Sequence, residues 1–284
     1  MSEPVLESAD GFSRIRVDCQ YDGSDFSGWS IQPDRRSVQS VVEDVLSRVL
    51  DCEITTTVAG RTDAGVHAQG QVFHFDIPNS LRANWDLDSL LYISNRILTS
   101  EIRFTSIAQA PSDFHARYSA LRRRYRYQLL DGARTLNPLE RVATIAYHRE
   151  LDESAMNQAS TLLLGEHDFA AFCRAREGTT TIRCLEEFAW SRGNDGVLRA
   201  SIVADAFCHN MVRSLVGAMM MVGDQRWDPN RPREILDSKV RHSHIAPAAG
   251  LTLMEVEYPP PAEYGQRAKR VTARALRTGD FDRP

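Results

Sequence analysis

The chain has 284 residues, of which 42% are hydrophobic and 25% charged, and its formal net charge is −4. This composition is that of an ordinary globular protein, and it excludes disordered and collagen-like chains. The length suits one large domain or two modest ones. The acidic balance excludes a uniformly basic surface for nucleic acid, although net charge does not describe how the charges are distributed.

The five cysteines, Cys19, Cys52, Cys173, Cys184 and Cys208, include no C-x-x-C pair. An odd number without close pairs predicts neither a disulfide framework nor a zinc ribbon. The first twelve residues are acidic and lack the apolar core of a secretory signal. No run approaches the roughly 18 apolar residues that span a bilayer. The sequence therefore predicts a reduced, cytoplasmic protein.

Hydrophobic periodicity in the first half alternates between the patterns of strands and helices. Residues 15–21 alternate apolar and polar side chains, which is typical of a half-buried strand. Residues 38–50 have the spacing of an amphipathic helix, with Ser37 as its N-cap. The remaining predicted elements are a strand over 53–58, a loop over 59–70, a strand over 73–77, a helix over 87–98 and a strand over 102–107. The predicted order is β-α-β-β-α-β.

The second half repeats this order. Its predicted elements are a strand over 125–129, a helix over 156–164, strands over 182–190 and 197–207, helices over 209–223 and 233–239, and a strand over 251–258. The two halves predict an α+β fold of two ferredoxin-like split β-α-β units whose sheets join edge to edge. The predicted divisions are an N-terminal extension (1–12), an N-terminal subdomain (13–115), a C-terminal subdomain (116–258) and a partly helical surface tail (259–284).

The loop AGRTDAGVHAQG, residues 59–70, is the first candidate site. An aspartate close to glycine is common in tight turns, and this is the plain explanation for Asp63. However, the loop is longer than a hairpin needs, and it places Arg61 two residues from Asp63. Long ordered loops on a rigid sheet often carry catalytic residues. The two histidines nearby, His67 and His74, match no metal-binding spacing and are expected to be structural, so we assign no metal.

The segment RYSALRRRYRY, residues 117–127, carries five arginines and no acidic residue. Tyr125 and Tyr127 alternate with Arg124 and Arg126, so aromatic and cationic side chains lie on opposite faces of the predicted strand. Aromatic rings stack on unpaired bases and arginines bind phosphates. An RNA-binding cleft and a solvated arginine face both explain this segment. Further arginines flank a Gly/Thr loop, at Arg174, Arg176 and Arg183.

The predicted helix in CHNMVRSLVGAMMMVG has a core stripe made of Met211, Val212, Leu215, Val216 and Met219. Arg213 lies off this stripe, near the start of the helix. It is either exposed or directed into a cleft toward a carboxylate.

Together, five segments resemble tRNA pseudouridine synthases of the TruA family. In chain order they are YDGSDFSGWSIQP with SVQSVVE, AGRTDAGVHAQGQVFHF, RRYRY, FCHNMVRSLVG and APAAGLTL. The resemblance extends from about Ile15 to Tyr258, and the GRTDAGVHA block is very specific. The sequence departs from many relatives at Ser30, where glutamine is usual, and at Asn210, where histidine is usual.

The resemblance implies an isomerase that converts uridine to pseudouridine at positions 38, 39 and 40 of the tRNA anticodon stem-loop, without metal or cofactor. It implies a continuous, mostly antiparallel sheet with the active-site cleft between the two halves, and a homodimer that binds tRNA. Asp63 matches the catalytic aspartate, Tyr125 the tyrosine that stacks on the target base, and Arg213 an arginine that pairs with the aspartate. Arg61 resembles the arginine that fills the space left by the flipped nucleotide. Arg124, Arg126, Arg174 and Arg176 are candidate RNA contacts.

Three alternatives remain. The chain could be a non-catalytic RNA-binding module, although the intact Arg61 and Asp63 argue against this. It could be a metal-dependent hydrolase that uses Asp63, His67 and His74, although no ligand spacing supports it. Within the isomerase class, it could act on other tRNA positions or on another RNA.

Overall fold

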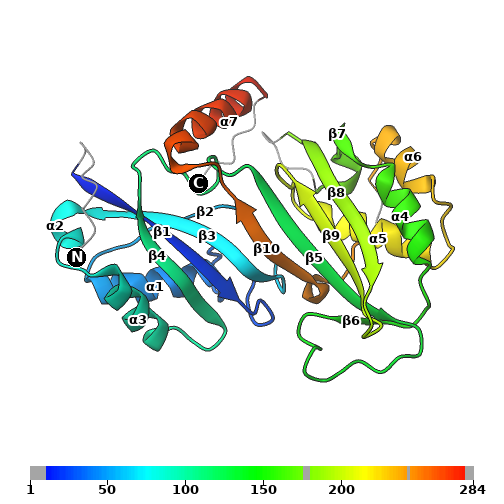
Figure 1. The fold of residues 1–284 in the computed structure, drawn as a ribbon, viewed down its shortest axis with the longest axis horizontal. Coiled ribbons are helices and arrows are strands. Elements are labelled where there is room, and N and C mark those ends of the chain that lie inside the picture. Colours follow the sequence, from blue (N-terminus) through cyan, green and yellow to red (C-terminus); the bar gives the residue numbers. More distant parts are fainter. Residues whose placement is uncertain (1–10, 175–179, 242–243, 279–284) are drawn as a thin grey trace. The chain divides into compact units, whose positions relative to one another are not determined.

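The structure, a computed structural model, describes residues 11–174, 180–241 and 244–278 (Figure 1). Its fold is mixed α+β with mostly antiparallel strand pairing, which confirms the predicted class. The chain divides into two compact units: residues 1–121 with 255–273, and residues 122–254 with 274–284. Most of the predicted extension over residues 1–12 and the last six residues of the predicted tail lie outside the described residues.

The first unit contains an antiparallel group of strands in the order β4-β1-β3-β2. These strands are β1 (Phe12–Tyr21), β2 (Thr57–Val58), β3 (His67–Pro78) and β4 (Ile102–Ala110). The helices between these strands in the sequence are α1 (Val38–Leu50), α2 (Asn79–Arg82) and α3 (Leu87–Ile97). Helix α3 packs against both β4 and α1.

The helix and strand patterns predicted for the first unit are largely confirmed. In β1 the alternation buries Ile15, Val17 and Cys19, and Ser37 caps α1 by accepting a hydrogen bond from the Ser40 N–H. The strand predicted over 53–58 is wrong except at Thr57–Val58. The physical reason is that the helix α1 binds this backbone: the Ile54 N–H donates to Ser47 Oγ, and the Thr56 N–H donates to the Glu43 carboxylate. Strand β3 begins at His67, inside the predicted loop.

The tail contains the predicted helix. It follows a 3₁₀ turn at Pro261–Glu263 and is α7 (Tyr264–Thr278). Its first residue, Tyr264, is buried, and its ring lies 4.9 Å from that of Phe114. The backbone of this turn of α7 is bound as well, because Ser119 Oγ donates to the Tyr264 carbonyl. The start of the tail is therefore part of the first unit rather than a loose extension.

The second unit contains strands in the order β5-β9-β8-β7, all antiparallel to their neighbours, with β6 parallel to β5. They are β5 (Arg122–Asp131), β6 (Ile145–Tyr147), β7 (Gly165–Asp168), β8 (Ile182–Arg192) and β9 (Leu198–Ala204). Its helices are α4 (Glu153–Thr161), α5 (Met211–Gly223) and α6 (Arg231–Ser238), with 3₁₀ turns at Ala170–Phe172 and Ala248–Gly250. Strand β10 (Leu251–Glu257) has residues in both units.

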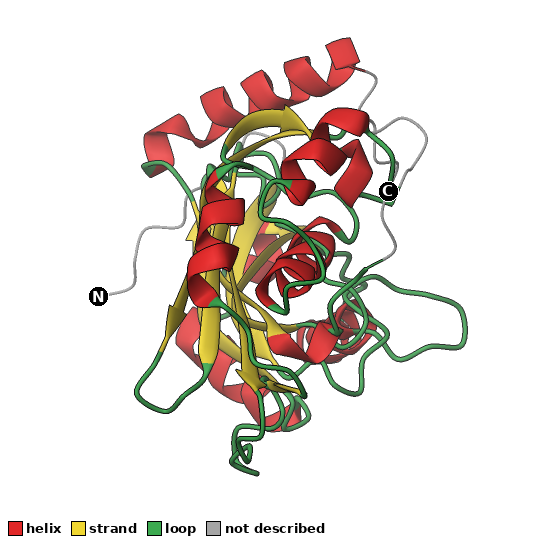
Figure 2. Ribbon diagram, turned by 90° about the vertical axis from the view of Figure 1, so that its right-hand side faces the viewer, coloured by secondary structure: helices red, strands yellow, loops and turns green. Residues whose placement is uncertain are grey.

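Helix α4 packs against β8 and α5. Figure 2 shows helices lying against the strands. The helix predicted over 156–164 is shifted toward the N-terminus, because Asp152 caps it by accepting a hydrogen bond from the Ala155 N–H. Strands β6 and β7 are not among the predicted elements. With three and four residues respectively, these strands are too short to show a period.

Candidate functional site

Asp63 lies in a turn that the rest of the loop and its neighbours hold in place. The Val66 N–H donates to the Asp63 carbonyl over 3.1 Å. Gly65, between them, has φ +77, as a type II turn requires at its third residue. The Asp63 side chain is half-buried and Arg61 is exposed. The loop therefore presents a carboxylate and a guanidinium on a well-defined turn.

The segment 21–29 packs so closely on this loop that two of its positions accept only glycine. A Cβ on Gly28, which has φ +96, would lie 2.7 Å from the Thr62 carbonyl oxygen. A Cβ on Gly23 would lie 2.0 Å from the Val66 carbonyl oxygen. Backbone hydrogen bonds accompany this approach, from the Trp29 N–H to the Thr62 carbonyl and from the Gly65 N–H to the Phe26 carbonyl. The YDGSDFSGW segment is thus the platform for the Asp63 turn.

Side chains that the sequence analysis did not single out complete this platform. The buried hydroxyls of Tyr21 and Thr62 lie 2.7 Å apart. Gln71 Nε2 donates to the Tyr21 hydroxyl and to the Gly60 carbonyl. These three side chains come from β1, the loop and β3, so they fasten the loop to both strands. Only the alternation of Tyr21 and Gln71 with their neighbours hinted that these side chains face inward.

The two histidines near the loop accept hydrogen bonds from backbone N–H groups. The Gly23 N–H donates to His67 Nδ1 over 3.0 Å, and the Ala116 N–H donates to His74 Nδ1 over 3.2 Å. Burial, together with Arg14 and His115, lowers the pKa of His74 to about 3. Among the described residues, no group of three or more His, Cys, Asp or Glu side chains could hold a metal ion. In the same part of the chain, no helix has the length and apolarity to cross a bilayer.

In the second unit, β5 places Tyr125 and Tyr127 on one face and Arg124 and Arg126 on the other, as its sequence predicts. Tyr125 is 7% exposed, and its ring lies 5.2 Å from that of Phe207 at an angle of 88°. Tyr127 is fully buried, and its hydroxyl donates to the Pro247 carbonyl. Burial raises the pKa of Tyr127, against the opposing effect of the nearby Arg213 guanidinium. This face therefore connects β5 with Phe207, the 246–247 segment and Arg213.

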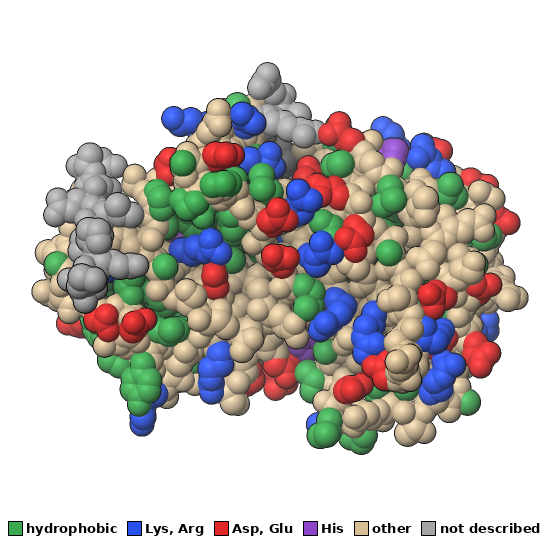
Figure 3. Space-filling model, in the orientation of Figure 1, with side chains coloured by type: hydrophobic (Ala, Val, Ile, Leu, Met, Phe, Trp, Pro, Cys, Tyr) green, Lys and Arg blue, Asp and Glu red, His purple; other side chains and the backbone are tan. Residues whose placement is uncertain are grey.

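Arg124 and Arg126 lie on the other face of β5, and their surroundings are mixed in charge. Arg124 donates to Glu187 and to Ser201 Oγ. Arg126 is half-buried beside Arg199, and burial, with the Arg199 charge, lowers its pKa. A groove of about 410 Å³ lies here, lined in part by Arg124, Arg126, Arg199, Glu187 and Ser201. Basic and acidic side chains are interspersed over β5, β8 and β9 (Figure 3). This is not a purely cationic surface.

One arginine on the Tyr125 face was missed. Arg123 precedes Tyr125 by two residues, so the strand alternation places both side chains on the same face. Arg123 is 8% exposed, and its Nη1 donates to the Asp205 carbonyl over 2.7 Å. The same alternation that separates Tyr125 from Arg124 could have predicted this. Of the remaining candidates, Arg174 is exposed, and Arg176 lies outside the described residues.

Arg213 is distinct within α5. All thirteen residues of this helix are described, and every one except Arg213 is buried. Its Nε donates to the Ala246 carbonyl over 2.8 Å, and the Ala246 N–H donates back to the Arg213 carbonyl. The helix is preceded by Asn210 with φ +65, a left-handed conformation that asparagine adopts more readily than most residues. The departure at Asn210 therefore suits the local backbone.

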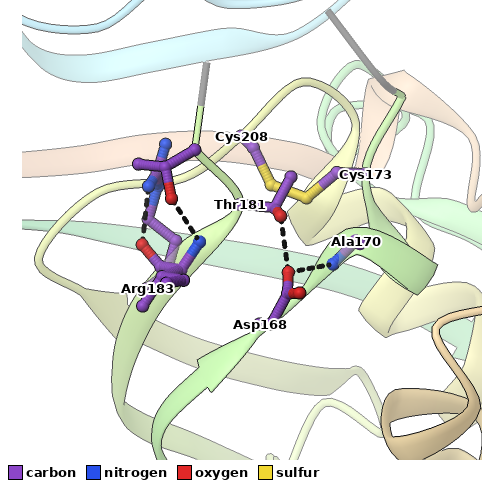
Figure 4. Close-up of a disulfide and its surroundings, with 8 residues drawn as sticks. Asp168, Ala170, Cys173, Thr181, Arg183 and Cys208 are labelled. Carbon is purple, nitrogen blue, oxygen red and sulfur yellow. Dashed lines mark hydrogen bonds between the residues drawn. A yellow bond between two sulfur atoms is a disulfide. The ribbon is translucent and has the colours of Figure 1, made fainter. Parts of the chain in front are cut away.

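The expectation of a wholly reduced chain is wrong for one pair of cysteines. A disulfide joins Cys173, which follows the Ala170–Phe172 turn, to Cys208, which precedes α5 (Figure 4). The remaining cysteines, Cys19, Cys52 and Cys184, are not part of this disulfide. The pair is separated by 35 residues in the sequence, and only the fold brings its Cα atoms to 5.8 Å. This distance is within the ordinary range for a disulfide.

The predicted site residues thus fall into two groups. Arg61 and Asp63 lie together on the loop of the first unit. Tyr125 and Arg213 lie in the second unit, where Tyr127 and the 246–247 segment connect their elements. The pairing of Asp63 with Arg213 stays a prediction.

Comparison with known proteins decides the family. A family model described as tRNA pseudouridine synthase matches residues 19–119 and again residues 159–259. The chain belongs to the tRNA pseudouridine synthase family. The same family model matches both halves of the chain, and this supports the prediction that the second half repeats the element order of the first.

Curated relatives agree over nearly the whole length. The chain is 48% identical to tRNA pseudouridine synthase A of Streptomyces griseus subsp. griseus, over 94% of this chain and 95% of that protein. It is also 48% identical to the protein of the same name from Frankia casuarinae, over 94% of this chain and 97% of that protein. The relative from Mycobacterium leprae, again of that name, is 43% identical over 93% and 96%.

Proposed function

We propose that this chain isomerises uridine to pseudouridine in the anticodon stem-loop of tRNA, at positions 38, 39 and 40. The observation that carries the proposal is the near full-length identity to proteins named tRNA pseudouridine synthase A. The structure supports it with a rigid turn that presents Asp63 from the most specific block of the sequence.

Asp63 is the proposed catalytic residue. The reaction breaks the N1–C1′ bond of uridine and forms a C5–C1′ bond, while one proton leaves C5 and another joins N1. No atom is gained or lost, so the isomerisation needs no co-substrate. A carboxylate serves this chemistry by attacking C1′, by attacking the base or by abstracting a sugar proton. The half-buried position of Asp63 on its turn is compatible with all three routes.

The other site residues are proposed to bind and orient. A base inside a helical stem must leave the stack before it can react. We assign Arg61 to the space that this nucleotide leaves, and Tyr125 to stacking on the flipped base. Arg213 is assigned to Asp63, where a guanidinium would keep the carboxylate ionised and oriented. Support for this last role comes from α5, in which every residue but Arg213 is buried.

Phosphate contacts are proposed for Arg174, Arg176, Arg124 and Arg126. Arg174 is exposed. Arg124 and Arg126 lie on the face of β5 opposite Tyr125, so they would contact only RNA that reaches this other face. We further propose that the enzyme is a cytoplasmic homodimer, as the resemblance implies.

The test is to incubate the protein with unmodified tRNA transcripts and to map pseudouridine by chemical adduct and primer extension. Wild type should form product in the anticodon arm. Asp63→Asn is nearly isosteric but cannot ionise, so it should form none while its affinity for tRNA stays within a few-fold of wild type. Asp25→Asn, an exposed aspartate on the neighbouring segment, is the matched control and should behave as wild type.

Pseudouridine formed by Asp63→Asn, with deamidation back to aspartate excluded, would remove Asp63 from its role. Product only at other tRNA positions, or only in another RNA, would favour the alternative substrate within the same class. RNA binding without product from wild type would favour the non-catalytic binding module.

A further inference from the structure

The Cys173–Cys208 pair lies between two segments that carry proposed site residues. Cys173 ends the turn Ala170–Phe172 and is followed by Arg174. Cys208 lies between Phe207, whose ring contacts Tyr125, and the start of α5, which holds Arg213. Nothing in the proposed reaction uses a thiol. The two cysteines therefore lie close to proposed site residues but have no role in the proposed reaction.

The segment around Cys208 is also held by hydrogen bonds near its two ends. At its start, Asp205 Oδ1 accepts from the Cys184 N–H and the Asp205 carbonyl accepts from Arg123 Nη1. The Arg174 N–H donates to the His209 carbonyl over 2.9 Å, and the Met211 N–H donates to the Cys208 carbonyl over 3.0 Å. Residues 205–210 are all half-buried and form no strand or helix. A covalent bond from Cys208 to Cys173 joins this segment to the turn that precedes Arg174 (Figure 4). Opening that bond leaves the hydrogen bonds at residues 205 and 209 in place and removes the covalent link at the residue next to Phe207.

We propose that Cys173 and Cys208 are a site of reversible thiol–disulfide modification that controls access to Tyr125. The inference rests on the proposed function, because it concerns the residue assigned to base stacking. Tyr125 is 7% exposed and packs against Phe207, whereas stacking on a base requires one free ring face. The disulfide fixes Cys208, the residue next to Phe207, and so it keeps the Phe207 ring against Tyr125. The disulfide form is the less active one, and the dithiol form is the active one.

The exchange chemistry uses a low-molecular-weight disulfide as the oxidant. Cys208 is partly exposed and Cys173 is 2% exposed, so the Cys208 thiolate is the one that attacks first. This attack forms a mixed disulfide and expels one small thiolate. The Cys173 thiolate then attacks Cys208 Sγ, forms the Cys173–Cys208 bond and expels the second small thiolate. The protein loses two protons and two electrons, and the small disulfide is reduced to two thiols.

The experiment prepares the full-length protein with dithiothreitol or with oxidised glutathione, removes the reagent, and measures three properties. Alkylation of the unfolded protein followed by mass spectrometry should label all five cysteines after reduction and three after oxidation, since two are then in the bond. Hydrogen exchange over residues 205–210 should be faster in the reduced protein. Pseudouridine formation on tRNA transcripts should be about tenfold slower in the oxidised protein, as a coupling of ordinary size predicts, and dithiothreitol should restore it.

Two sets of variants separate this bond from other thiol chemistry. Cys208→Ser and Cys173→Ala should each show the turnover of reduced wild type under both conditions, and circular dichroism checks that each is folded. Cys52→Ser and Cys184→Ser remove half-buried cysteines outside this disulfide, and both should retain the redox response of wild type.

Equal turnover in the two states, with the alkylation pattern showing that the bond has formed, would overturn the proposal. Alkylation of five cysteines after oxidation would overturn it too, because no bond then forms. Failure of the proposed function is distinguishable: neither preparation would then form pseudouridine, whereas the hydrogen-exchange difference at 205–210 would still report whether the bond controls this segment.

Discussion

The two groups of site residues are positioned in different ways. In the first unit, Asp63 lies on an irregular turn that is held through its backbone, by glycines that allow close approach and by carbonyls that accept hydrogen bonds. In the second unit, Tyr125 and Arg213 lie on a regular strand and a regular helix, and side-chain burial determines their directions. The comparison shows that a loop can be as well defined as a strand when its backbone bonds are satisfied.

The difference also predicts which substitutions do harm. Where the segment 21–29 approaches the loop most closely, an added methyl group should displace the backbone that carries Asp63, even though no side chain with a chemical role is changed. In the second unit, the loss of activity should depend on which aromatic ring or charged group the substitution removes. Three experiments test this contrast, in order of decreasing expected effect.

Gly28→Ala should have the largest effect. The new Cβ would lie 2.7 Å from the Thr62 carbonyl oxygen, and φ +96 is unfavourable for alanine, so the turn with Asp63 must shift. A displacement of about 1 Å can reduce catalysis by about 100-fold, and kcat on tRNA should fall by that order. Steady-state kinetics with mapped product measures it.

Gly60→Ala, on the loop that carries Asp63, is the matched control, because its Cβ would meet nothing within 4 Å. It should keep kcat within a few-fold of wild type. If both alanine variants lose activity equally, close backbone approach is not what positions Asp63.

Tyr125→Ala tests whether loss of a side chain, without a backbone shift, does the harm in the second unit. Loss of one base–aromatic stack should weaken tRNA binding or the transition state by about 1–3 kcal/mol, whereas Tyr125→Phe retains the ring and should bind as wild type. Filter binding and single-turnover kinetics measure the two effects separately. If Tyr125→Ala and Tyr125→Phe behave identically, Tyr125 does not act by stacking. If Tyr125→Phe binds tRNA normally but loses turnover, the hydroxyl takes part in the reaction.

The pH dependence of stability tests how β3 is held beneath the loop. Burial lowers the folded-state pKa of His74 to about 3, from about 6.5 in an unfolded chain. Below pH 6.5 the unfolded state therefore binds more protons, and stability falls as the pH decreases toward 3. Between pH 7 and pH 5 this should cost about 1–2 kcal/mol.

His74→Asn retains a hydrogen-bond acceptor without this titration, so its free energy of unfolding in urea should depend less on pH than that of wild type. His148→Asn changes an exposed histidine and should leave the pH dependence unchanged. An equal pH dependence in wild type and His74→Asn would show that His74 is not held neutral by burial.

Periodicity and local motifs determined much of this protein without the structure. Helices α1 and α3 and strand β1 follow from apolar spacing, and the start of α1 follows from Ser37 as its N-cap, because these signals lie within a few residues of one another. Asp63 and Arg61 are identifiable for the same reason, since the whole block around them is contiguous.

Tertiary structure alone decided what depends on distant segments. It paired Cys173 with Cys208 across 35 residues, joined the hydroxyls of Tyr21 and Thr62, and withdrew residues 54–56 from a strand by binding them to α1. It also brought the Asp205 carbonyl to the Arg123 guanidinium, which donates to it. Each of these contacts joins residues whose separation in the chain carries no signal, because which side chains meet is set by how the elements pack.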